Sequence, residues 1–119
     1  MSQWHVIKLE LAPIEEFPNG SPGRAFLLRL PLGRDGTIDG ARLADAPRSA
    51  FVRRFWPNEP DRSGMIFPCT SGWTLAFAGE ETGQYCVLED GPATPGNVLT
   101  VRNAAGVRLP FRVLSVKED

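Results

Sequence analysis

The stretch Phe51-Val-Arg-Arg-Phe-Trp-Pro-Asn-Glu-Pro-Asp-Arg-Ser-Gly64 is the densest mixture of aromatic and charged residues in the 119-residue chain. Its first six residues alternate in a way that predicts a β-strand over Phe51–Trp56. The prolines and glycine that follow are typical of a turn. Met65–Cys69 then supplies the second strand of a predicted hairpin. The connection is long for a hairpin, and long connections more often carry function.

Both faces of this predicted strand carry an arginine among apolar groups. Arg53 alternates with two phenylalanines, whereas Arg54 alternates with a valine and Trp56. A strand in a soluble barrel places apolar groups inside and charge outside, so one of the two arginines needs a special environment. That arginine can pair with Glu59 or Asp61, lie flat on an aromatic ring, or line a pocket and bind an anion.

The rest of the chain is divided into short segments by 12 glycines and 11 prolines, which are spread along its length. Ala25–Leu32 has apolar residues at every second position and predicts a strong strand. Val98–Arg102 and Leu109–Val116 form a predicted closing pair around a turn at Asn103–Gly106. Asp39–Ala46 is the one segment that predicts a helix, with Asp39 as its cap.

These segments predict an all-β protein, a small antiparallel barrel with about seven short strands and one short helix. Helix is expected in under about a fifth of the residues, below the usual share in globular proteins. A length of 119 residues fits a single domain spanning residues 1–119.

Composition limits the classes of partner. The net charge of −1 and the pI of about 5.8 argue against nucleic-acid binding, which usually shows as a basic domain. The sequence has neither a recognisable export signal nor an apolar run of membrane-spanning length. We therefore expect a cytoplasmic protein whose two cysteines, Cys69 and Cys86, are reduced thiols.

Most site chemistries are not indicated. The single histidine, His5, excludes sites that need two imidazoles from one chain, and no phosphate-binding loop is present. A nucleophilic pair of His5 with Cys69 or Cys86 is left open, although a cysteine is more often simply buried. We accordingly expect no metal, no cofactor and no catalytic residue.

Several motifs together resemble a group of small bacterial proteins of unknown function. The motifs are Val52-Arg-Arg-Phe-Trp56, Asp61-Arg-x-Gly64, Gly72-Trp-x-x-x-Phe77, Pro95-Gly96 and Phe111-Arg-Val-x-Ser-Val116. The resemblance covers most of the chain. It implies a bacterial, single-domain, β-rich protein, and it carries over no catalytic residue.

The leading functional expectation is a non-enzymatic binding module that recognises a small anionic ligand or an acidic protein surface. Its predicted contact residues are Arg53, Arg54, Trp56, Glu59, Asp61 and Arg62. One alternative is a small enzyme with an acid/base site beside the loop 57–64, using Asp61 or His5. A second alternative is a single-stranded nucleic-acid binder that stacks bases on its tryptophans. The oligomeric state is left open.

Overall fold

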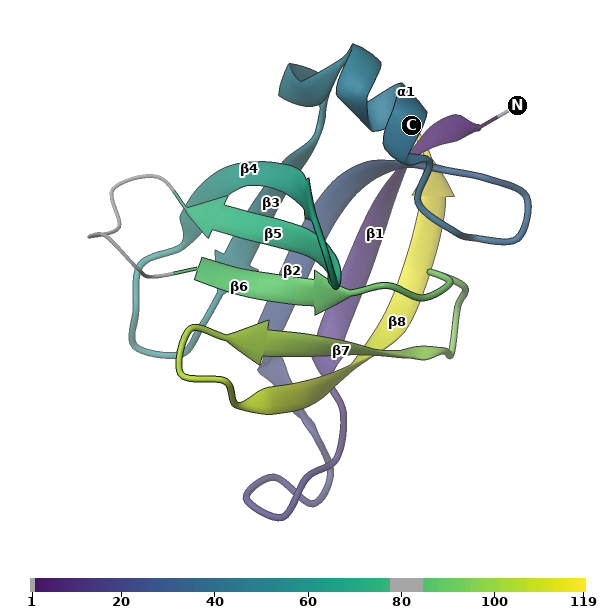
Figure 1. Ribbon diagram of the computed structural model, residues 1–119. Coiled ribbons are helices and arrows are strands. Elements are labelled where there is room, and N and C mark those ends of the chain that lie inside the picture. The colour runs from purple at the N-terminus through teal and green to yellow at the C-terminus, as the bar shows by residue number, and fades with distance from the viewer. Residues whose placement is uncertain (1, 78–84) are drawn as a thin grey trace.

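Eight antiparallel strands close into a barrel in the computed structural model, which describes residues 2–77 and 85–119 (Figure 1). Each strand pairs with its neighbours in sequence, and the first strand pairs with the last. Strands make up 56% of the described residues and helix 8%, which confirms the predicted all-β barrel. The strands are β1 (Gln3–Leu11), β2 (Ser21–Leu32), β3 (Phe51–Phe55), β4 (Arg62–Cys69), β5 (Gly72–Phe77), β6 (Tyr85–Glu89), β7 (Val98–Asn103) and β8 (Arg108–Glu118).

The expected count of about seven strands is one too low, and two strands begin earlier than the sequence pattern indicates. β2 begins at Ser21 rather than Ala25 because Ser21 pairs with Leu11 past a register shift, in which residues 22–24 of β2 have no partner on β1. Pro22 is tolerated there since the start of a strand does not require its N–H. β4 begins at Arg62 rather than Met65. An acidic turn expected at 78–84 falls outside the described residues.

Alternation along the strands determines what fills the barrel. Leu28, Leu30 and Val52 are fully buried, and β2–β3 pairing places Leu28 opposite Val52. On β1 and β5 the same alternation points a large apolar side chain inward at every second position: Ile7, Leu9 and Leu11 on β1, and Trp73, Leu75 and Phe77 on β5. Burying a leucine or phenylalanine contributes about 1.5–3 kcal/mol, so this continuous core holds the barrel closed.

One end of the barrel is covered by α1 (Gly40–Asp45) and a single 3₁₀ turn (Pro47–Ser49). The predicted cap is confirmed, since the Asp39 carboxylate accepts a hydrogen bond of 3.0 Å from the backbone N–H of Arg42. Leu43 is buried in the core, and the Trp73 ring lies against Gly40. Both chain termini lie near this end (Figure 1).

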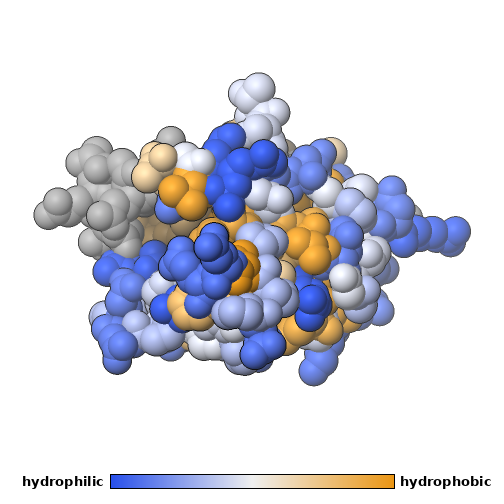
Figure 2. All heavy atoms as spheres, turned by 90° about the horizontal axis from the view of Figure 1, so that it is seen from below, coloured by the Kyte–Doolittle hydropathy of each residue, from blue (hydrophilic) through white to orange (hydrophobic). Residues whose placement is uncertain are grey.

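The opposite end, here named the mouth, is formed where the β1–β2, β3–β4 and β7–β8 connections meet. Strand order requires this, because in an up-and-down barrel every second connection lies at the same end. Figure 2 views the molecule from the side of the β1–β2 loop, where apolar side chains appear between hydrophilic ones. Side chains that end strands at the mouth are therefore candidates for a shared site.

Two further expectations bear on the chemistry. Cys69 and Cys86 are thiols that are not joined in a disulfide, as predicted. Across the residues that the structure describes, no helix is both long and apolar enough to span a membrane.

Candidate binding site at the mouth of the barrel

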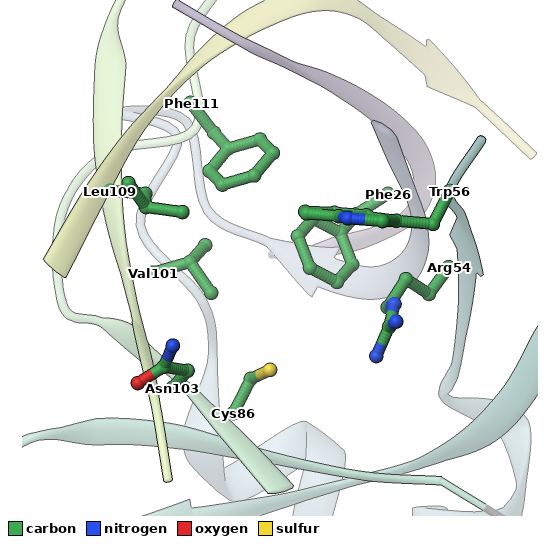
Figure 3. Close-up of a pocket in the computed structure, with 8 residues that line it drawn as sticks. All are labelled: Phe26, Arg54, Trp56, Cys86, Val101, Asn103, Leu109 and Phe111. Atoms are coloured by element: carbon green, nitrogen blue, oxygen red, sulfur yellow. The ribbon is translucent and has the colours of Figure 1, made fainter. Parts of the chain in front are cut away.

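A cavity of about 240 Å³ opens among the strand ends at the mouth. Figure 3 shows the side chains that surround it. They come from five strands and the β3–β4 connection. The lining residues are Phe26, Arg54, Trp56, Cys86, Val101, Asn103, Leu109 and Phe111.

Three aromatic rings form one wall of the cavity. The Phe26 and Phe111 ring centroids are 5.0 Å apart in an edge-to-face arrangement, and the Trp56 ring lies 6.1 Å from Phe26 and 6.4 Å from Phe111. Such pairs are favourable beyond the area that they bury, so the wall is a rigid apolar surface. Space remains beside it because the facing positions hold smaller side chains such as Cys86 and Val101.

Arg54 is the charged residue of the cavity lining. It points inward because Val52, two residues earlier on β3, is inside the barrel, and because Arg54 itself pairs with the buried Phe26 on β2. Its Nη2 donates a 3.1 Å hydrogen bond to Oε1 of Glu59. Its guanidinium carbon lies 4.9 Å from the Trp56 ring centroid. Arg54 thus pairs with Glu59, lies near an aromatic ring and lines a cavity.

A tight turn between Trp56 and Glu59 places Glu59 beside Arg54. The backbone N–H of Glu59 donates to the carbonyl of Trp56 at 3.3 Å, and Asn58 has a φ of 62°. A type II turn favours a proline at its second position and requires a positive φ at its third. Pro57 occupies the second position of this turn and Asn58 the third. This tight turn holds the acid beside the arginine.

The other sequence-predicted residues are divided between the inside and the outside of the hairpin. Arg62 is half-buried and lies directly across from Arg54 in the β3–β4 pairing. Arg53 and Asp61 are exposed and lie 3.8 Å apart in an ion pair. The structure therefore brings Arg54 and Trp56 to the cavity, with Glu59 and Arg62 next to them, and leaves Arg53 and Asp61 on the outer surface.

Two groups named in the enzyme alternative are separated. Asp61 is exposed on the β3–β4 connection, while His5 lies near the start of β1, the end at which α1 packs. Cys86 lies at the mouth, so His5 and Cys86 are at opposite ends of the barrel. Within residues 2–77 and 85–119, no group of three His, Cys, Asp or Glu side chains is placed to hold a metal ion.

A second, wider hollow of about 400 Å³ surrounds the β4–β5 turn and is lined by Cys69, Thr70, Ser71, Thr74, Val87 and Arg102. Burial raises the pKa of the Cys69 thiol, but hydrogen bonds from Thr74 and Ser71 outweigh that effect, and the pKa lies below its ordinary value. Arg102 donates to the Ser71 hydroxyl at 3.1 Å. This hollow lacks the aromatic wall of the mouth cavity.

Five of the lining residues were not singled out as site residues from the sequence, which placed Asn103 only in a turn. The sixth, Cys86, was considered only as a nucleophile beside His5. Each follows a simple pattern, since it is an inward-facing residue near the mouth end of its strand. These residues can be predicted as cavity-lining residues once the order of strands around the barrel is known.

No protein-family model matches the chain, and neither the curated proteins nor the solved structures gave a match. The fold and the site are therefore described by their own geometry, as a closed eight-stranded up-and-down barrel with a cationic cavity at one end.

The two neighbouring arginines of β3 should differ little in their effect on stability. Replacing Arg54 with glutamine is expected to cost about 1 kcal/mol, because Glu59 is 41% exposed and can be hydrated when its partner is lost. The same change at Arg53 should cost under about 0.5 kcal/mol, since both partners of that pair are about half exposed. Urea unfolding measures both values, and a loss of several kcal/mol for Arg54→Gln would show instead that the pair is a buried structural element.

Proposed function

We propose that this protein is a non-enzymatic binding module that takes a small ligand with an apolar body and an anionic group into the mouth of its barrel. The observation that carries the proposal is the Arg54 guanidinium in the lining of a cavity whose remaining walls are mostly aromatic and aliphatic. Pockets for small molecules typically combine apolar walls with a few polar groups that fix orientation.

The guanidinium has donors left for a ligand. Arginine carries five N–H donors, and within the described residues Arg54 makes one side-chain hydrogen bond, the 3.1 Å contact with Glu59. Its side chain is 20% exposed, so an anion that reaches it is partly removed from water. A charge-assisted hydrogen bond in such surroundings is stronger than one between neutral groups.

Cavity size sets the size of the ligand. At about 30 Å³ per water molecule, 240 Å³ corresponds to roughly eight waters. An eight-stranded barrel has room for one small ligand at most, so a single substituted aromatic ring with an acidic group fits this site. Among the described residues, the lining combines one arginine with aromatic and aliphatic walls, and this combination supports a binding role.

The proposal is tested by titrating the protein with 4-isopropylbenzoate and with its neutral isostere 4-isopropylbenzamide, following amide chemical shifts and Trp56 fluorescence. The carboxylate is expected to bind at least about tenfold more tightly than the amide, the size of effect typical of a key arginine. Arg54→Gln should abolish this preference, and the matched control Arg53→Gln on the outer face should retain it. Equal binding of the two compounds, or no binding of either, contradicts the proposal.

A further inference from the structure

A second polar group of the cavity has its orientation fixed by the β7–β8 turn. The Oδ1 atom of Asn103 accepts hydrogen bonds of 3.0 Å from the backbone N–H groups of Ala105 and Val107. The oxygen and nitrogen of an asparagine amide are assigned from their partners, and two N–H donors require the oxygen on that side. The Nδ2 atom must therefore be on the other side of the amide.

The amide nitrogen of Asn103 faces the cavity. Figure 3 shows it turned toward Val101, with the oxygen turned away toward the turn. Its neighbours in the lining are Val101, Cys86 and Leu109, which provide no strong acceptor. Asn103 is exposed, and within the part of the chain that the structure describes its Nδ2 donates to no protein group, so this atom can donate to a ligand oxygen.

Among the described residues, the two strongest polar groups that line the cavity both present hydrogen-bond donors. Arg54 offers charged donors from β3, Asn103 offers a neutral donor from β7, and the Cys86 thiol is a weak donor and acceptor. Figure 3 shows open space between Arg54 and Asn103, with the aromatic and aliphatic side chains of the lining around it. A ligand that fits must bring acceptors to both donors and apolar surface between them.

We propose that the mouth cavity selects anions that carry a second, uncharged acceptor oxygen, such as a carbonyl. This oxygen lies at the end of the molecule away from the anionic group, and Asn103 donates a hydrogen bond to it. The inference rests on the proposed function, since it takes the anionic group to be held by Arg54. It also implies discrimination against ligands whose far end is a donor, because two donors that face each other form no hydrogen bond.

Three benzoates of nearly the same shape test this selection. 4-Acetylbenzoate carries an acceptor at the far end, 4-isopropylbenzoate is its apolar isostere, and 4-amidinobenzoate carries only donors there. In the wild-type protein the acetyl compound should bind about fivefold more tightly than the isopropyl compound, which is the contribution of one neutral hydrogen bond. The amidino compound should bind most weakly.

Asn103→Asp is the matched variant, because it keeps an oxygen for the two turn N–H groups and replaces the donor with an acceptor. The order of affinities should invert, with 4-amidinobenzoate gaining and 4-acetylbenzoate falling below the isopropyl compound. Unchanged amide chemical shifts of Ala105 and Val107 would verify that the turn is retained.

The outcomes separate this inference from the proposed function. If 4-isopropylbenzoate binds and depends on Arg54, but the acetyl preference is missing or survives in Asn103→Asp, the role of Asn103 is overturned and the binding module stands. If none of the three benzoates binds, or if Arg54→Gln leaves all affinities unchanged, the proposed function fails and this inference fails with it.

Discussion

Replacing Phe111 with alanine is expected to lower the free energy of unfolding by about 3–5 kcal/mol, the largest effect that we predict for a single side chain. Phe111 is 1% exposed, and its ring contacts Phe26 edge to face at 5.0 Å. Its backbone pairs with Leu11 on β1 and Leu99 on β7, so the side chain lies where three strands meet. Removing the ring leaves a hole that these paired strands cannot close.

The control is Leu114→Ala, on the same strand. Leu114 is 41% exposed, so its truncation should change stability by less than about 0.5 kcal/mol. Urea unfolding of both variants gives the comparison, with the dependence on urea concentration expected to stay unchanged if only stability is altered. Similar losses for the two variants would contradict the inward and outward assignment of β8. Since domains have total stabilities of about 5–15 kcal/mol, Phe111→Ala should bring this protein close to unfolding.

The fold class was predictable because it depends on local patterns. Alternation in Ala25–Leu32, the turn residues at Asn103–Gly106 and the cap at Asp39 all act over a few residues, and each appears in the structure as expected. The start of β2 was predicted wrongly because Ser21 becomes a strand residue through its pairing with Leu11, which lies across a loop. A pairing of this kind leaves little trace in the sequence around either residue.

The candidate site was only partly predictable, for a related reason. Alternation within Phe51–Trp56 indicated that each face carried one arginine, but it could not indicate which face was inward. The pairing of Arg54 with Phe26 on β2 decides this, and it is a long-range contact. Once Arg54 is inside, the loop acid that can reach it is Glu59, whereas Asp61 meets Arg53 outside.

The remaining lining residues lie far from that hairpin in the sequence. Cys86, Val101 and Asn103 belong to β6 and β7, and they approach Arg54 only because the barrel closes. None of them has a side chain that indicates binding by its type alone. Their contribution comes from position, since small side chains at the mouth leave space that larger ones would fill.

Gly64→Ala is expected to destabilise the protein by about 3 kcal/mol, because overpacking against a fixed backbone has a cost of this order. A Cβ atom on Gly64 would lie 2.0 Å from the carbonyl oxygen of Ala76 and 2.8 Å from the Cα of Phe77. Both atoms belong to the backbone of β5, and moving them would break the β4–β5 pairing. The loss of stability therefore comes from a steric clash with the backbone, which an alanine cannot relieve by rotating its side chain.

Gly96→Ala is the control that separates the steric clash at Gly64 from the loss of glycine's conformational freedom. Gly96 has a φ of +87° with no atom within 4 Å of an added Cβ, so alanine there should cost about 1 kcal/mol through its backbone conformation alone. Equal losses for the two variants in urea unfolding would contradict the close approach of β4 and β5. Gly64 also pairs with Val52, two residues before Arg54, so a displaced β4 should weaken 4-isopropylbenzoate binding in Gly64→Ala but not in Gly96→Ala.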